Sequence, residues 1–343
     1  MGGAWMYGIG NKKMLNMFIL EILRNYTDED HSLTQQEIIK LLEKDYGMVC
    51  DRRSVKNNVL LLKEFGESHG FEISMEDGYR MVFREFDDAE LRILIDSVLF
   101  SKAFSSNQAK ELIKKIRGLS SKYFNAKVSN ICNIPELNKN INRQNIYSID
   151  KINDAISEGH KISFIYNDIG TDFKLHPRRK ERYIVNPYRI VANNGKFYLI
   201  GNYDKYDNVV HFRIDKMTEV CELEDRVKPM KDVPELKAGI NLPKHMAEHI
   251  YMFSGTSTAV KLLTTKDMMS ELVDWFGTDF SIIKKDEDRI TVRVNCNEKA
   301  MKFWALQYGP YVEVLEPESL RNQIKESIAD MSKKYSDRLG EFK

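Results

Sequence analysis

Three amphipathic helices followed at once by a hairpin are the feature that most constrains the fold of this chain. Apolar residues at helical spacing run along Leu15–Tyr26. Thr34 and Glu37 form a capping box that opens a second helix, and Asp51 caps a third. Alternating runs on either side of Asp77-Gly78 predict a two-stranded hairpin. Helix, helix, turn, helix and hairpin in this order predict a winged helix-turn-helix domain.

The third predicted helix carries side chains suited to DNA along its first turns. With Val55 facing inward, cations and an asparagine fall on the exposed side, where a recognition helix meets base edges and phosphates. An ordinary solvated helix face is the alternative, but the capping box and the hairpin favour DNA binding. In the hairpin, Arg80 is placed to reach a flanking phosphate. The candidate DNA-binding residues are Arg52, Arg53, Ser54, Lys56, Asn57 and Arg80.

The overall charge restricts how this chain could bind nucleic acid. Its 343 residues include 52 Lys and Arg against 51 Asp and Glu, a formal net charge of +1. This balance argues against indiscriminate coating of nucleic acid but is compatible with local basic patches. A hydrophobic content of 42% excludes wholesale disorder. At about 150 residues per domain, the length predicts two or three domains.

Two further amphipathic helices are predicted, over Asp88–Phe104 and Asn107–Phe124. A polar stretch without periodicity, 125–144, follows them and is interpreted as a connector. Ser148 is predicted to cap a short helix that ends at Gly159.

The periodicity then changes from helical to alternating. From Lys161 to Leu223, short β runs with regular turn signals predict a small antiparallel barrel or sandwich. The last part alternates strand and helix in the order βαββαβα, which predicts a ferredoxin-like domain and makes the chain a multidomain α+β protein. The predicted divisions are a flexible tail at 1–11, the winged domain at 12–84, a helical connector at 85–147, the β domain at 148–226, a linker and helix at 227–254 and the C-terminal domain at 255–343.

The β domain contains a second run of cations, with aromatic residues interleaved. Between Lys174 and Arg189 six cations stand against the single acid Glu181. Cations with stackable rings on a small β domain suit nucleotides or single strands, and a loop of solvated charges is the alternative. Further on, alternation places His211, Arg213 and Asp215 on one face of a strand, as a polar site or as a structural ion pair.

Several other signals are weak. His245 and His249 are four residues apart on a predicted helix, as a metal pair would be, but no third ligand is identifiable. We interpret them as a surface pair and predict no metal site and no cofactor. The four cysteines form no CxxC pair, and no run approaches the roughly 20 apolar residues needed to span a bilayer. No catalytic motif is present, so we expect a cytoplasmic binding protein that is not an enzyme and does not bind membranes.

The motifs of the β domain resemble those of the WYL-domain transcriptional regulators of bacteria. The resemblance covers nearly the whole chain beyond the tail, because the winged domain and the C-terminal motifs Tyr308-Gly309, Val312-Glu313-Val314 and Pro317 also look like the family. Phe197-Tyr198-Leu199 stands where the family has its eponymous triplet, with Phe in place of Trp, and Val210 stands where some relatives have Arg. The matching segments are Ile162–Tyr166, Tyr183–Tyr188, Gly195–Gly201 and His211–Met217.

The resemblance implies a winged DNA-binding domain, an Sm-like (SH3-like) β-barrel WYL domain and a C-terminal extension domain, assembled as a homodimer. It further implies a regulator that binds operator DNA and senses an anionic effector, either a nucleotide or a single-stranded nucleic acid. An accessory RNA- or single-stranded-DNA-binding protein, for example CRISPR-associated, is the alternative. The candidate effector-binding residues are Tyr166, Arg182, Tyr188, Tyr198, His211 and Arg213.

Overall fold

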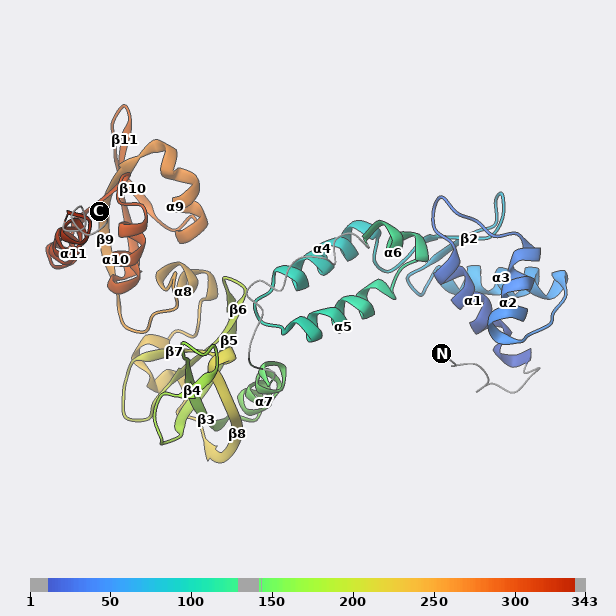
Figure 1. Cartoon of the computed structure of the whole chain (residues 1–343), viewed down its shortest axis with the longest axis horizontal. Coiled ribbons are helices and arrows are strands. Elements are labelled where there is room, and N and C mark those ends of the chain that lie inside the picture. Colours follow the sequence, from blue (N-terminus) through green and yellow to red (C-terminus); the bar gives the residue numbers. More distant parts are fainter. Residues whose placement is uncertain (1–11, 129–141, 143, 337–343) are drawn as a thin grey trace, which may run out of the picture. The chain divides into compact units, whose positions relative to one another are not determined.

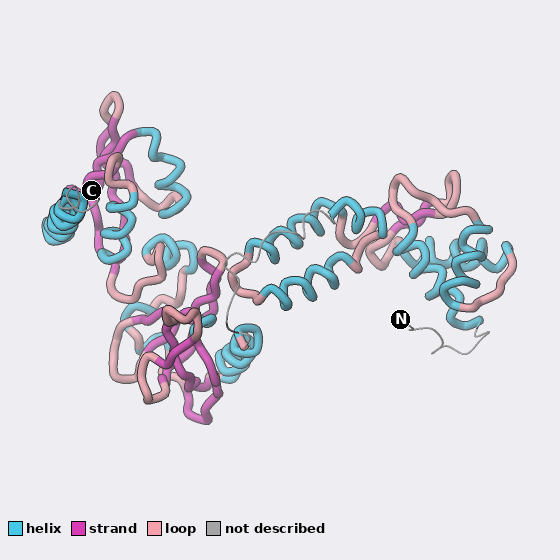
Figure 2. The backbone as a smooth tube through the Cα atoms, in the orientation of Figure 1, coloured by secondary structure: helices cyan, strands magenta, loops and turns pink. Residues whose placement is uncertain are grey.

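The structure is a computed structural model, and it describes residues 12–128, 142 and 144–336. The chain divides into two compact units, residues 1–140 and 141–343, each built from helices and strands (Figures 1 and 2). The expected multidomain α+β class is therefore confirmed. The tail predicted at 1–11 lies outside the described residues. Among the described residues, no helix is long and apolar enough to cross a membrane.

The first unit begins with the predicted helices and hairpin. Its elements are α1 (Leu15–Tyr26), α2 (Gln35–Tyr46), α3 (Arg52–Gly66), β1 (Glu72–Ser74) and β2 (Arg80–Phe83). The capping box is present, because the Glu37 backbone N–H donates to Thr34 Oγ1 and the Glu37 carboxylate accepts from the Thr34 N–H at 2.8 Å. Gly47 ends α2 with a φ of 63°, which only glycine adopts at little cost. Ile19, Ile38 and Val59 are fully buried where the three helices meet.

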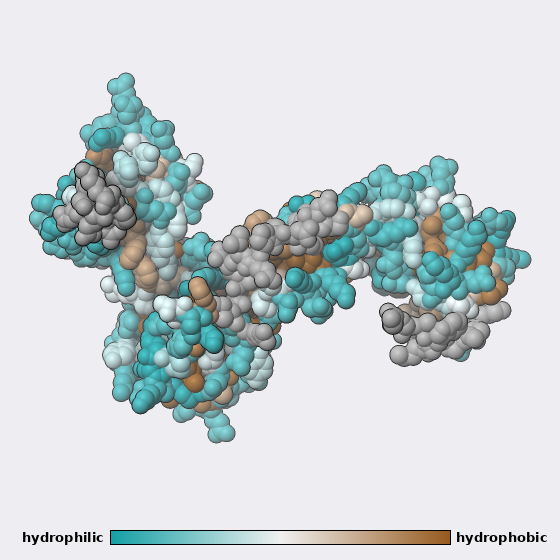
Figure 3. All heavy atoms as spheres, in the orientation of Figure 1, coloured by the Kyte–Doolittle hydropathy of each residue, from teal (hydrophilic) through white to brown (hydrophobic). Residues whose placement is uncertain are grey.

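Three further helices complete the described part of this unit: α4 (Asp88–Phe100), α5 (Ser106–Arg117) and α6 (Lys122–Val128). The continuous helix predicted over Asn107–Phe124 is wrong, because α5 ends at Gly118 and a second helix begins at Lys122. The Ser121 hydroxyl accepts from the backbone N–H of Phe124 and thereby starts α6. Several apolar side chains stay exposed along α4, among them Ile93 and Phe100. Figure 3 shows hydrophobic atoms in brown on the surface of the stretch that holds α4 and α5.

The second unit opens with α7 (Asn145–Glu158). The prediction that Ser148 caps this helix is wrong, because the helix begins three residues earlier and Ser148 lies buried inside it. Gly159 ends α7 in the left-handed conformation, with a φ of 70°, as predicted. The apolar face of α7 packs on the sheet that follows it through Ile152 and Ala155.

That sheet is curled and has six strands among the described residues. They are β3 (His160–Ile169), β4 (Leu175–Pro177), β5 (Tyr183–Asn193), β6 (Lys196–Asn202), β7 (Val209–Arg213) and β8 (Met217–Arg226). The long β3 pairs with β4, β5 and β8, while the order continues from β5 through β6 to β7, so the sheet folds over its own core. Phe164, Leu199 and Phe212 are buried in that core.

A linker with helix α8 (Leu242–Glu248) leads to a four-stranded antiparallel sheet in the order β10-β11-β9-β12. Its elements are β9 (Ser257–Thr265), α9 (Met269–Phe276), β10 (Ser281–Lys285), β11 (Arg289–Asn297), α10 (Glu298–Gln307), β12 (Val312–Glu316) and α11 (Glu318–Ser336). This is the predicted βαββαβα succession. The core centres on Trp304, which is fully buried.

Candidate nucleic-acid interface and effector site

The first turns of α3 present an exposed polar surface opposite a buried face. Asp51 caps the helix by accepting from the Ser54 N–H at 2.7 Å. Because Val55 and Val59 are fully buried, the neighbouring side chains on the other side point away from the core. The exposed residues there are Arg52, Arg53, Lys56 and Asn57. Their guanidinium, ammonium and amide groups can reach phosphate oxygens and base edges.

The two other candidates on this unit are less accessible. The Ser54 hydroxyl donates to the Asp51 carboxylate at 3.1 Å, so it supports the helix cap. Arg80 lies in β2 of the hairpin, and its Nε atom is buried with no hydrogen-bond partner in the part of the chain that the structure describes. The Asp77-Gly78 turn of this hairpin has positive φ at both residues, 53° and 113°, as an Asp-Gly hairpin turn requires.

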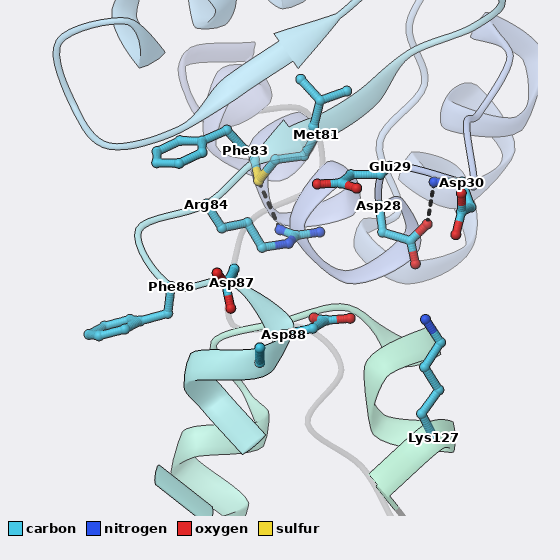
Figure 4. Close-up of a pocket in the computed structure, with 12 residues that line it drawn as sticks. Asp28, Glu29, Asp30, Met81, Phe83, Arg84, Phe86, Asp87, Asp88 and Lys127 are labelled. Carbon is cyan, nitrogen blue, oxygen red and sulfur yellow. Dashed lines mark hydrogen bonds between the residues drawn. The ribbon is translucent and has the colours of Figure 1, made fainter. Parts of the chain in front are cut away.

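A pocket of about 290 Å³ lies between the hairpin and the start of α4 (Figure 4). Arg84 reaches across it, donating to the Met81 sulfur at 2.8 Å and to the Thr27 carbonyl at 2.6 Å. Burial lowers the pKa of Arg84. Acidic side chains outnumber the two cations of the lining, Arg84 and Lys127, so this pocket disfavours an anionic effector. The acids are Asp28, Glu29, Asp30, Asp87 and Asp88.

In the β domain, Arg213 contacts or neighbours two other candidates for the effector site, Tyr166 and Tyr198. Its guanidinium donates twice to Asp215, with Nη2 to Oδ2 at 2.6 Å and Nε to Oδ1 at 3.0 Å. Asp215 does not lie on the strand as predicted, because β7 ends at Arg213 and Asp215 belongs to the 3-10 turn Ile214–Lys216; it nevertheless forms an ion pair with Arg213. Tyr198 is the cross-strand neighbour of Arg213, and the Tyr166 hydroxyl accepts from the Arg213 backbone N–H at 3.2 Å. Burial raises the pKa of Tyr166 to about 12, so this phenol stays protonated.

The remaining effector candidates lie elsewhere on the domain. Tyr188 is buried and donates its hydroxyl to the Lys228 carbonyl at 2.8 Å. Arg182 bonds the carboxylate of Glu219 at 3.1 Å and also the Glu219 carbonyl. His211 does not join Asp215, because its Nε2 lies 2.8 Å from Nε2 of His245. The structure therefore brings Tyr166, Tyr198 and Arg213 together and gives the other three separate partners.

Four cations of the predicted run, Arg178, Arg179, Lys180 and Arg182, lie in the loop between β4 and β5, while Lys174 precedes β4 and Arg189 lies in β5. Arg178 lies over the ring of Tyr166 at 5.0 Å, and Arg179 lies over the ring of Tyr183 at 3.6 Å. Both rings are buried beneath these guanidinium groups, so they are not open platforms for bases. Arg178 also forms a bidentate ion pair with Asp168, at 2.8 and 2.9 Å.

The sequence did not reveal the three-histidine cluster formed by His211, His245 and His249. The interpretation of the last two as a surface pair is wrong for His249, which is only 6% exposed. The four-residue spacing of His245 and His249 was the one feature of the sequence that could have indicated the cluster. The third imidazole could not be identified because it comes from β7, 34 residues before His245.

Comparison with known families assigns two of the regions described above. The WYL domain model matches residues 148–222, which hold α7 and most of the curled sheet, and the WCX domain model matches residues 256–332. The chain therefore contains regions that match the WYL and WCX domains, and its resemblance to WYL-domain transcriptional regulators is confirmed.

Individual relatives are distant. The chain is 22% identical over 187 residues to the uncharacterized HTH-type transcriptional regulator YobV of Bacillus subtilis, covering 54% of this chain and 55% of that protein. It thus spans about half the length of this curated relative. Among solved structures, proteasome accessory factor B/C of Arthrobacter aurescens aligns with 92% of this chain and 50% of its own, at 17% identity and a TM-score of 0.31. A CRISPR Cas-related protein aligns with 95% of this chain and 81% of its own, at 13% identity and a TM-score of 0.40.

Proposed function

We propose that this protein is a transcriptional regulator, and not an enzyme, that binds operator DNA through α3 and the β1–β2 hairpin. In this proposal the first five elements are a winged helix-turn-helix, the curled sheet is an Sm-like barrel and the C-terminal sheet is ferredoxin-like. The observation that carries it is the exposure of Arg52, Arg53, Lys56 and Asn57 on the first turns of α3, opposite a buried apolar face. A homodimer would place two such helices on an operator with two half-sites.

The effector part of the proposal rests on the Arg213–Asp215 ion pair. An anionic ligand, a nucleotide or a short single strand, would compete with the Asp215 carboxylate for the Arg213 guanidinium. Tyr198 of β6 pairs with Arg213 of β7 and is half-buried. It adds a hydroxyl and a ring edge to the proposed anion site. When the ligand replaces the Asp215 carboxylate at Arg213, the local structure at the end of β7 would change, and ligand binding would thereby alter the sheet.

Selection of bound duplexes from a random DNA pool by the full-length protein tests this function. We expect enrichment of one sequence, with two related half-sites if the protein binds as a dimer. Repeating the selection with short single-stranded oligonucleotides present should change the enrichment. Recovery of duplexes without any shared sequence would contradict operator binding.

A second candidate function is supported by a different observation: the cations Arg178, Arg179 and Lys180 are exposed on the β4–β5 loop. We propose that this loop, in an accessory role, binds the phosphates of RNA or single-stranded DNA. The covered tyrosine rings imply that charge, and not base stacking, would provide most of the affinity.

Asp168 provides a sharp test of this second function. Its carboxylate neutralises Arg178 and Lys216, and these partners hold its pKa well below the usual range. Replacing Asp168 by Asn should strengthen single-strand binding by up to about fivefold, because an exposed ion pair is worth about 0.2–1 kcal/mol. Because the carboxylate is already ionised, the difference should stay constant from about pH 5 to pH 8.

Fluorescence anisotropy with a labelled single-stranded oligonucleotide measures this effect. Arg178→Ala should weaken binding, while Lys110→Ala, a cation exposed on α5 in the other unit, should leave it unchanged. If Asp168→Asn and Arg178→Ala both leave the affinity unaltered, the loop does not bind single strands.

A further inference from the structure

A cluster of three imidazoles joins the WYL domain to the linker that follows it. His211 lies on β7, and His245 and His249 lie one turn apart on and just after α8. One nitrogen of each ring lies within 4.8 Å of one nitrogen of both others. The rings of His245 and His249 are stacked, with centroids 4.3 Å apart, and the ring of His211 is 4.9 Å from that of His249. We refer to these three residues as the histidine cluster.

The spacing of the nitrogens is close to that of a metal site. Nε2 of His211 and Nε2 of His245 are 2.8 Å apart. In tetrahedral zinc coordination with Zn–N bonds of about 2.0–2.1 Å, two ligand nitrogens are about 3.3 Å apart. Modest rotations of the side chains would therefore admit an ion. The separation of His245 and His249 by three residues is also typical of ligand pairs in structural zinc sites.

Further hydrogen bonds help to position the cluster. Nδ1 of His249 lies 3.0 Å from the His245 carbonyl, and Nε2 of the same ring lies 3.4 Å from the Gly255 carbonyl. A proton on Nδ1, at the shorter of these contacts, would leave the Nε2 lone pair for an ion. The backbone N–H of His211 donates to Ser254 Oγ at 3.0 Å and holds β7 against the linker. A backbone carbonyl that accepts from the second nitrogen is the usual partner of a metal-ligating histidine.

Without a metal ion, the imidazole nitrogens of the cluster lack some of their hydrogen-bond partners among the described residues. A single N–H···N bond can join His211 to His245. Nδ1 of His211 is buried and has no hydrogen-bond partner of normal geometry among the described residues, although the Phe253 backbone near it raises the pKa of the ring. Burial, together with neighbouring imidazoles, lowers the pKa of His211 to about 3 and of His245 to about 4.

We propose that the histidine cluster binds a divalent transition-metal ion, for which Zn²⁺ is the best candidate among imidazole-binding metals. The prediction of no metal site is replaced by this proposal. Three protein ligands leave a fourth position open. A pocket of about 360 Å³, lined by His245 and His249 together with Glu235 and Glu248, adjoins it and can supply a water molecule.

The ion would link two parts of the second unit. The linker already packs on the WYL domain, where Val233, Leu236 and Met252 share an apolar cluster with Val209 of β7. Helix α8 also contacts β11 of the WCX domain. A metal held by β7 and α8 would therefore fasten the WYL domain to the segment that leads into the WCX domain.

Metal titration of the untagged, chelator-treated full-length protein tests the proposal. Calorimetry with Zn²⁺ should show one ion per chain, and Co²⁺ should give visible ligand-field bands of a four-coordinate site with imidazole ligands. The temperature of unfolding should rise with Zn²⁺, since the ion binds the folded chain. Absence of both Zn²⁺ and Co²⁺ binding by the folded wild-type protein would overturn the proposal without reference to any variant.

Variants locate the ion. His245→Gln and His249→Gln should each lower the Zn²⁺ affinity by about 100-fold or more, since even loss of an outer-sphere partner costs about 10–100-fold. His69→Gln is the matched control, because His69 is exposed in the other unit and leaves the cluster intact. Circular dichroism without metal checks that each variant folds. Unchanged affinity in both folded cluster variants would place any bound ion elsewhere and overturn the assignment.

Discussion

Replacing Arg52, Arg53 and Lys56 together by alanine should weaken binding of the selected operator duplex by about 100-fold or more at physiological salt. Each arginine or lysine contact to a base or phosphate is worth about 1–3 kcal/mol, and 1.4 kcal/mol is a factor of ten. The substitutions should leave the fold intact, because all three side chains are exposed and alanine favours helix. Fluorescence anisotropy at several salt concentrations measures the effect.

The salt dependence identifies what kind of contacts were lost. Each phosphate contact contributes about 0.9 to the slope of log affinity against log salt, so the variant should lose about 2 to 3 units of slope if all three cations meet phosphates. The matched control replaces Lys110, Lys114 and Lys115 of α5, which removes the same charge from another exposed helix face. Equal losses in the two variants would mean that bulk charge, and not α3, binds the operator.

Replacing Arg213 by Met should lower the free energy of unfolding by about 3 kcal/mol. The Asp215 side chain is only 11% exposed, so loss of Arg213 leaves a carboxylate that water cannot fully solvate. The double variant Arg213→Met with Asp215→Asn removes both charges and should recover most of the loss. Chemical denaturation of the single and double variants measures the coupling of the pair.

The double variant also separates stability from sensing. It should fold, yet a short single-stranded oligonucleotide should no longer change its operator binding, because the anion-binding guanidinium is gone. A stable double variant that still responds to the oligonucleotide would place the effector site away from Arg213. A loss below about 0.5 kcal/mol in the single variant would show that solvent screens the pair.

Local elements of the fold could be predicted because their signals are local. The capping box at Thr34 and the left-handed glycines at 47 and 159 act within a few residues, and all are present. The two misplacements have different causes, the first local and the second tertiary. The apolar pattern continued past Gly118, but the hydroxyl of Ser121 starts a separate helix there, and Ser148 is buried inside α7 by packing on the sheet.

The candidate sites also divide into features that follow from the local sequence and features that depend on tertiary packing. The sequence could predict the exposure of Arg52, Arg53 and Lys56, because it follows from helix periodicity once Val55 is known to face inward. The sequence could not show that Arg178 and Arg179 cover the tyrosine rings proposed for stacking, because that depends on how the β4–β5 loop folds back over β3 and β5.

By itself, then, the sequence determined the order of the elements, the cationic start of α3 and the presence of the WYL motifs, all of which depend on residues close together in the chain. Only the tertiary structure decided which side chains share a site. Arg213 pairs with Asp215, while His211 turns to two histidines of the linker. The physical reason is that alternation along a strand fixes the face on which a side chain lies, whereas its partner is set by whichever segment packs against that face.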